Sequence, residues 1–330
     1  MHINKTGLIG LLSVTLVAGC LDPSEDGNLV PKTVDEDPTL PQLAFNGSRF
    51  HLEAFGNEAD PVVIMLHGGP GSDYRSMLGL RMAVDGQRLE DTHRVVFWDQ
   101  RGSGLSQRHD ADDFDIGIYN QDLDWLIEHF SPGRPVVLVG HSWGGMYASA
   151  YISEHPSKVA GAVLIEPGPL TGDLFEDIKQ DVVNFDLFGE WLNDFTWAQS
   201  VISPDDHARA DFLRLVGMLS HDLQPDFGDT ETPLFWREGA VANTAMQNDG
   251  LKDGKGVWDF TTGLAEFTTP VLFMASERNT VIGEQFQRRQ LGFYPNADLI
   301  VIQNSGHEVP FTQPEATLRA ILSYLDEINL

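Results

Sequence analysis

The sequence has 330 residues, 42% of them hydrophobic and 21% charged, which suits one large globular domain with an insertion, or two smaller domains. Its formal net charge of −28 argues against nucleic acid as a partner, because phosphate binding needs lysine and arginine gathered on one face. The single cysteine excludes an internal disulfide.

The first twenty residues are predicted to be an export signal. Lys5 provides a positive start, and an apolar run over 7–17, shorter than the roughly 18 residues that span a bilayer, leads into V-A-G-C ending at Cys20. This ending resembles a bacterial lipobox, which implies lipidation of Cys20 and anchoring in the cell envelope; a secretory signal with an incidental cysteine is the alternative. Residues 21–44 are expected to be a flexible tether.

Short apolar runs alternate with helical patterns in the rest of the chain. This alternation predicts an α/β fold with a mostly parallel, doubly wound sheet whose core comprises 45–169 and 264–330. The strand rhythm breaks over 170–263, which we expect to be an inserted, mostly helical lid. The predicted strands cover 62–66, 95–98, 136–139, 162–165, 271–274 and 299–302, and clear helical patterns cover 121–128 and 314–328.

The run at 136–139 leads into Gly-His-Ser-Trp-Gly-Gly, which matches the G-x-S-x-G nucleophile elbow with Ser142 at its centre. A serine hydroxyl is a poor nucleophile unless a sharp strand-to-helix turn presents it to a base, and the glycines leave room for that turn. The following residues, 146–152, read as a helix that stops near Pro156. Ser142 is therefore the candidate nucleophile.

A glycine turn, His-Gly-Gly-Pro-Gly, follows the run at 62–66. Acyl transfer needs backbone N–H groups aimed at the developing oxyanion. One donor is expected from Gly69 or Gly68 and the second from Trp143, the residue after the nucleophile. The turn matches neither a phosphate-binding loop nor a dinucleotide fingerprint.

His307 follows the last predicted strand and is the candidate general base. No histidine shows metal-ligand spacing such as H-E-x-x-H, so neither a metal nor a cofactor is expected.

The acid that should orient His307 is less obvious. The loop after 271–274 holds Glu277 and, where an aspartate is expected, Asn279, whose amide cannot stabilise an imidazolium. Glu166 ends the strand at 162–165, on the same sheet edge as Ser142, and a carboxylate closing a buried strand needs a partner. Glu166 is our preferred acid; Glu277, Asn279 or no functioning acid remain as alternatives.

These motifs together resemble the proline iminopeptidase branch of the α/β-hydrolases. The resemblance rests on the turn at 67–71, on the elbow, on Gly-His at 306–307, on Asp-Leu-Asp-Trp-Leu at 122–126 and on Asp-Gln-Arg-Gly-Ser-Gly-Leu-Ser at 99–106. It implies Ser142 as nucleophile, His307 as base, the oxyanion turn at Gly68 and Gly69, and a site floor formed by 99–106. Asp99 could equally anchor a loop through Arg101.

The resemblance implies an aminopeptidase that releases an N-terminal proline or similar residue from short peptides. The family's acidic residues for the substrate amine cannot be placed, and Glu190, Asp194 and Glu238 are candidates. An esterase or amidase for small acyl substrates, or a non-catalytic binding lipoprotein on a hydrolase fold, are the alternatives. A serine at position 142 argues against dehalogenase or epoxide hydrolase chemistry, which needs a carboxylate nucleophile there. Substrate identity and oligomeric state are left open.

Overall fold

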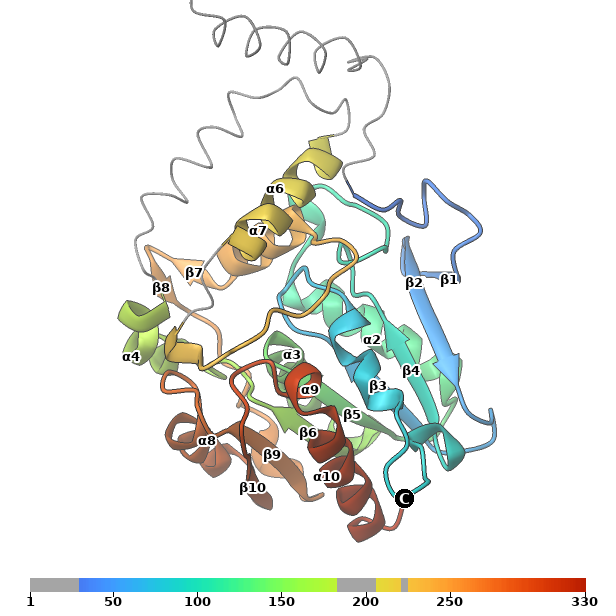
Figure 1. Ribbon diagram of the computed structural model, residues 1–330, viewed down its shortest axis with the longest axis vertical. Helices are drawn as coiled ribbons and strands as arrows, with labels where there is room; N and C mark the ends of the chain where they lie inside the picture. Colours follow the sequence, from blue (N-terminus) through green and yellow to red (C-terminus); the bar gives the residue numbers. More distant parts are fainter. Residues whose placement is uncertain (1–29, 183–205, 221–224) are drawn as a thin grey trace, which may run out of the picture.

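The computed structural model describes residues 30–182, 206–220 and 225–330. An eight-stranded sheet with strand order β1-β2-β4-β3-β5-β6-β9-β10 forms its centre (Figure 1). The β1–β2 and β2–β4 pairs are antiparallel and the remaining pairs are parallel, which confirms the predicted mostly parallel sheet. The strands are β1 (Gln42–Phe45), β2 (Ser48–Phe55), β3 (Val62–Leu66), β4 (Arg94–Trp98), β5 (Val136–His141), β6 (Val159–Ile165), β9 (Val271–Ser276) and β10 (Ala297–Ile302).

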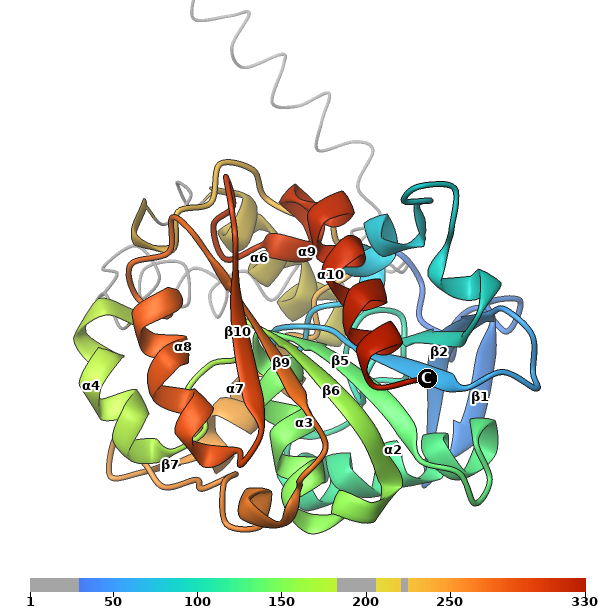
Figure 2. The same cartoon turned by 90° about the horizontal axis from the view of Figure 1, so that it is seen from below.

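Helices cover both faces of the sheet, with α2 and α3 on one side and α9 and α10 on the other (Figure 2). Along β5, Leu138 packs into the core beneath α2 and α3, whereas Val137 and Val139 pack into the core beneath α10. Because both faces are buried, the strands read as continuous apolar runs. These helices are α2 (Ile116–Phe130), α3 (Trp143–Glu154), α8 (Glu284–Gln290), α9 (Val309–Thr312) and α10 (Pro314–Glu327), and the 3₁₀ helix η1 (Tyr74–Arg81) packs beside α9 and α10.

The β1–β2 hairpin was not among the predicted elements. Its turn consists of Asn46 and Gly47, with φ of 44° and 71°. Two positive φ values in succession suit a two-residue hairpin turn, and Asn-Gly is the strongest short-range sequence signal for one. The dipeptide was therefore available in the sequence as evidence for two additional strands.

The segment before β1 is packed against the domain from about residue 31, unlike the flexible tether expected over 21–44. Val34 is fully buried and its amide donates to the carbonyl of Leu105. The guanidinium of Arg237 donates to the Pro31 carbonyl and to the Glu36 carboxylate. The two Arg237 contacts join the start of the described chain to a residue about 200 positions later.

The proposed signal, with Cys20, lies outside the described residues and stays a prediction. Within the part of the chain that the structure describes, no helix is long and apolar enough to cross a membrane.

The region expected to be a lid contains helices and one short hairpin. Helices α6 and α7 lie together at one end of the molecule. The 3₁₀ helix η5 (Pro225–Phe227) lies near α4, and from it the loop at 228–239, here called the lid loop, crosses the domain and leads into α7 (Figure 1). The short hairpin was not predicted. Glu190 and Asp194, two candidates for binding the substrate amine, lie outside the described residues. The elements are α4 (Gly172–Val182), α6 (Asp206–Ser220), α7 (Ala240–Asp249), β7 (Leu251–Lys252) and β8 (Lys255–Gly256).

Candidate active site

Ser142 occupies the sharp turn between β5 and α3, with φ 54° and ψ −118°. The turn has no room for side chains at its glycines. A Cβ on Gly140 would lie 2.3 Å from the Gly144 carbonyl oxygen, and a Cβ on Gly144 would lie 2.0 Å from the Leu66 carbonyl oxygen. The glycines of the elbow are thus required by close backbone packing between β3, β5 and α3.

His307 lies between Ser142 and Glu166 and contacts both. Its Nε2 is 2.9 Å from the Ser142 Oγ, and its Nδ1 is 3.0 Å from the Glu166 Oε2. Because a carboxylate only accepts, Nδ1 must carry the proton, which leaves Nε2 free to accept the hydrogen bond of the serine hydroxyl. This order of contacts allows an imidazole to remove a proton from a hydroxyl while a carboxylate steadies the resulting cation.

Glu166 directly follows β6 and its side chain is fully buried. Both its Oε1 contacts come from Ser276, whose amide and hydroxyl each donate at 2.6 Å. Its Oε2 accepts from His307 and from the Asn279 amide group, the latter at 2.8 Å. The two oxygens of the Glu166 side chain therefore accept from four donors.

The two alternative acid positions are arranged differently. Asn279 contacts Glu166, and its side-chain oxygen accepts from the Val281 and Ile282 amides. Glu277 is exposed and accepts from the Asn304 amide. Among the described contacts, only Glu166 of these three places a carboxylate on His307.

The electrostatic surroundings favour the protonated form of His307. Burial alone would lower the pKa of His307, but the hydrogen bond and charge of Glu166, with the charges of Glu308 and Asp229, raise it above the usual value. Burial also raises the pKa of Asp229 to about 6, although a hydrogen bond from the Glu308 amide acts to lower it. Three acidic groups therefore face His307: Glu166 after β6, Glu308 in the loop that carries the histidine, and Asp229 in the lid loop.

His141, next to the serine, holds the backbone of His307. Its Nε2 donates to the His307 carbonyl at 2.9 Å, and the two rings lie 4.9 Å apart. Burial and the neighbouring His307 lower the pKa of His141 to about 3, so it stays neutral at ordinary pH. Its role is to fix the position of the loop at 304–308.

The expected oxyanion donors lie around Ser142. A Cβ on Gly68 would be 3.3 Å from the Ser142 Cβ, so the glycine turn passes directly beside the serine. Gly69 has a φ of 120°, which favours glycine. Trp143 begins α3, where backbone N–H groups lack an acceptor within the helix.

Residues 99–106 contact both the glycine turn at 67–71 and the start of α3. Gln100 donates to the His67 carbonyl and accepts from the Trp143 indole N–H at 3.0 Å, so one side chain links both halves of the expected oxyanion site. The suggested anchoring of Asp99 through Arg101 is wrong. Asp99 binds His51 and the amides of Tyr74 and Leu105, whereas Arg101 pairs with Asp122.

Glu238 lies on the lid loop against the glycine turn. The next residue, Gly239, donates to the Gly71 carbonyl at 2.7 Å. Glu238 is fully buried; its Oε2 is 3.3 Å from Arg214, and its Oε1 has no hydrogen-bond partner among the described residues. Burial and the charge of Asp211 raise the pKa of Glu238, whereas the charge of Arg214 and hydrogen bonding from Ser72 and Arg214 lower it. A buried carboxylate oxygen without a donor is an open acceptor for a cation.

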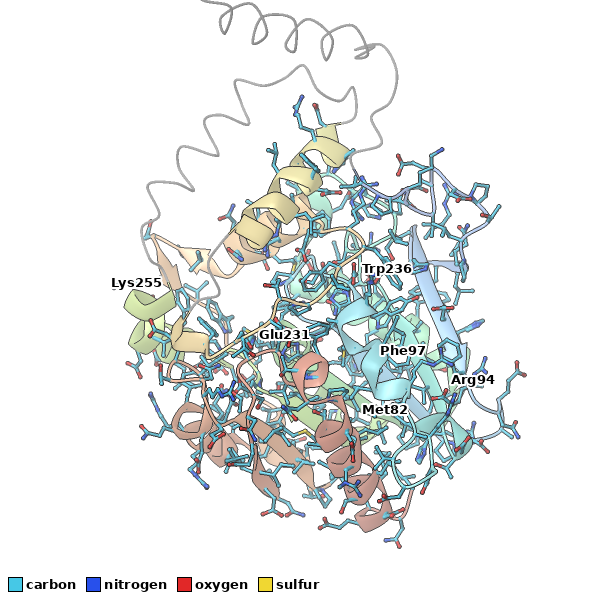
Figure 3. All side chains as sticks on the ribbon, in the orientation of Figure 1. Met82, Arg94, Phe97, Glu231, Trp236 and Lys255 are labelled. Atoms are coloured by element: carbon cyan, nitrogen blue, oxygen red, sulfur yellow. The ribbon has the colours of Figure 1, made fainter. Side chains whose placement is uncertain are left out.

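Trp236, labelled in Figure 3, lies on the same loop and packs edge-on against Tyr74 with ring centroids 5.0 Å apart. Asp73 accepts from the amides of Trp236 and Arg237. The lid loop is thus fastened to the core directly beside Glu238. Across the described ranges, no three His, Cys, Asp or Glu side chains gather in a way that could hold a metal ion.

The sheet, the elbow and the histidine loop define an α/β-hydrolase arrangement, and comparison with known proteins agrees. The model of the family described as "alpha/beta hydrolase fold" matches residues 61–314. The chain therefore belongs to the α/β-hydrolases, in the proline iminopeptidase-like branch.

Two relatives support this placement, and one solved structure shares the fold. The chain is 35% identical over 316 residues to the "Probable proline iminopeptidase" of Streptomyces coelicolor, covering 84% of this chain and 92% of that one. It is 24% identical over 295 residues to proline iminopeptidase PfmaB of Pestalotiopsis fici, covering 86% and 99%. The crystal structure of a proline iminopeptidase from Mycobacterium smegmatis shares the fold, with a TM-score of 0.59, 18% identity and coverage of 87% and 97%.

Proposed function

We propose that this chain is a serine hydrolase with Ser142 as nucleophile, His307 as general base and Glu166 as the acid, and that it acts as an aminopeptidase on short peptides. The observation that carries the hydrolase proposal is the unbroken set of hydrogen bonds from Glu166 through His307 to Ser142. Such a set transfers a proton from the hydroxyl without leaving a buried charge unpaired.

In the proposed reaction, the Ser142 oxygen bonds to the scissile carbonyl carbon while its proton moves to His307. The carbonyl electrons move to the oxygen, which accepts from the amides of Trp143 and of Gly69 or Gly68. The carbon–nitrogen bond then breaks as His307 returns the proton to the leaving amine. Water, activated by the same histidine, hydrolyses the acyl-enzyme and restores Ser142.

The aminopeptidase proposal is supported by Glu238. Its unpartnered oxygen lies on the loop that packs against the glycine turn, so a substrate whose carbonyl sits at that turn could place a protonated amino terminus near it. Three relatives bear proline iminopeptidase names, which favours the same substrate class. An esterase or amidase for small acyl substrates is the competing outcome.

The first test labels the full chain with a fluorophosphonate and assays it against prolyl and other aminoacyl anilides and against aryl esters. We expect labelling that disappears in Ser142→Ala, together with anilide turnover. Absence of Ser142-dependent labelling would contradict the hydrolase, and labelling with ester turnover alone would contradict the aminopeptidase.

The second test replaces the amine-binding group. Glu238→Gln should raise KM for aminoacyl anilides about 10- to 100-fold, the range expected for a lost hydrogen bond to a charged group, and leave fluorophosphonate labelling unchanged. Glu90→Gln is the matched control, because Glu90 also pairs with an arginine, Arg81, and also has one buried oxygen without a partner. An unchanged KM in Glu238→Gln would remove Glu238 from the site.

We further propose export of the protein and lipid attachment at Cys20, on the strength of the sequence pattern alone. Mass spectrometry of the mature N-terminus tests this, with Cys20→Ser as the control. A mature chain that starts elsewhere, or an unmodified cysteine, would contradict it.

A further inference from the structure

We propose that Asn279 is a positioning residue for Glu166: it holds the carboxylate in the orientation that binds His307 and takes no part in proton transfer itself. This inference rests on the proposed function, since it assigns a role within the same site. Asn279 stands where the related proteins are expected to carry the acid, so its contacts explain how the site works with an amide there.

The orientation of the Asn279 side chain is set by its own partners. Its oxygen accepts from the amides of Val281 at 2.9 Å and Ile282 at 3.0 Å, so that end of the group must be the oxygen. The NH₂ end is therefore the one that faces the Glu166 Oε2, 2.8 Å away. With 6% of its surface exposed, Asn279 has little freedom to turn.

The two oxygens of Glu166 are divided between two sets of donors. Ser276 occupies Oε1 with its amide and hydroxyl, whereas Asn279 and His307 share Oε2. Donors on both oxygens prevent rotation of the carboxylate about its last torsion. Loss of the Asn279 donor leaves the oxygen that faces the histidine held by the histidine alone.

The same geometry explains why residue 279 is not a second acid. A carboxylate there would face Glu166 at close to the present 2.8 Å, and two carboxylates this near cannot both be ionised. An acid at the end of β6 thus requires a neutral donor at the end of β9. In this chain the acid directly follows β6 and the neutral donor lies in the loop after β9.

The main test is a double-mutant cycle on the full chain, read as the rate of fluorophosphonate labelling at Ser142. Asn279→Ala should slow labelling about 10- to 100-fold in the parent and less than about 2-fold in the Glu166→Gln background, because its effect passes through Glu166. Ser131→Ala, which removes a side-chain hydrogen bond of another buried residue at the end of α2, away from the site, should change neither rate. Equal losses in both backgrounds would overturn the proposal.

Asn279→Asp keeps the acceptor for Val281 and Ile282 and donates to Glu166 only while it is protonated. Its labelling rate relative to the parent should therefore vary with pH, and a ratio that stays near one across the pH range would overturn the proposal. The charged and titratable groups that face this site are Glu166, His307, His141, Glu308 and Asp229. If Asn279→Ala does not fold, the labelling rate of Asn279→Asp replaces it as the test of the proposal.

A readout without catalysis separates this proposal from the proposed function. NMR of labelled histidines should show a changed pKa for His307 in Asn279→Asp, because the second carboxyl group shares a proton with Glu166 and so alters the charge on the oxygen that faces the imidazole. An unchanged pKa would overturn the coupling between residues 279 and 307. A parent chain that shows the coupling but no labelling at Ser142 would instead overturn the hydrolase.

Discussion

Two buried carboxylates are held in different ways. Glu166, at the carboxyl edge of the sheet, accepts hydrogen bonds from the end of β9 and from the loops that follow β9 and β10. Asp211, in the lid, is held by two arginines from other segments of the chain. Asp211 is fully buried and accepts from Arg108 at 2.9 Å, from Arg237 at 2.7 Å and from the Ala240 amide at 2.9 Å. Arg237 in turn binds Glu36, near the start of the described chain.

Under the proposed function, this difference separates the reacting groups from the group that binds the substrate amine. The groups around Ser142 sit on strand ends whose positions follow from the sheet, so the reaction machinery is part of the fold itself. The loop that carries Glu238 is held by Arg237, which forms a buried ion pair with Asp211 of α6, itself paired with Arg108, and a partly exposed ion pair with Glu36 in the N-terminal segment. A substitution that disrupts the lid loop should therefore leave the reactivity of Ser142 intact, and the following substitutions test that separation.

The largest effect is expected from Glu166→Gln. By analogy with the buried aspartate of a serine protease triad, kcat should fall about 10³- to 10⁴-fold while KM changes little. Since Glu166 raises the pKa of His307 and the base must be neutral, the acidic limb of the pH–rate profile should also move to lower pH. Steady-state kinetics from pH 4 to 9 measure both; a limb that does not move would contradict the assignment of Glu166 as the acid.

An intermediate effect is expected from Asp211→Asn, which leaves Arg108 and Arg237 without their shared buried counter-charge. Breaking such a pair costs about 3–5 kcal/mol, here concentrated in the lid, so KM for aminoacyl anilides should rise and limited proteolysis should cut the lid faster. Fluorophosphonate labelling of Ser142 should persist. Asp85→Asn, which removes an exposed partner of Arg319, is the control. Parallel loss of labelling would show that the two regions are not separable.

The smallest effect is expected from Gly47→Ala in the β1–β2 turn, away from both regions. A Cβ there meets nothing within 4 Å, but the φ of 71° disfavours alanine, so the free energy of unfolding should fall by about 1 kcal/mol. Denaturant melts measure this, and both kcat and KM should stay at parental values. A change in either would mean that the hairpin contributes to the site.

The sequence was sufficient for the parts of the molecule that depend on neighbouring residues. The strand runs, the turn at Ser142 and the placement of Glu166 at a strand end all follow from local pattern plus the rule that parallel strands share a carboxyl edge. The β1–β2 hairpin is equally local, because Asn46-Gly47 is a strong hairpin-turn signal, although it lies outside the predicted strands.

The remaining features depend on partners far apart in the chain. Arg237 and Glu36 are 201 positions apart, and no local pattern indicates that such residues meet. For the same reason residues 31–37 resembled a linker by composition although Val34 is fully buried. Asp99 was assigned a neighbour in sequence, Arg101, while its partner His51 comes from another strand.

Ser142 and Glu166 share one further property: both are non-glycine residues with positive φ, 54° and 41°, at the ends of adjacent parallel strands. Such conformations cost on the order of 1–3 kcal/mol each, and glycine would relieve most of the cost. Selection for thermostability alone would therefore favour glycine at both positions and abolish the proposed chemistry. Directed evolution for heat resistance should accordingly be run with an activity screen at every round.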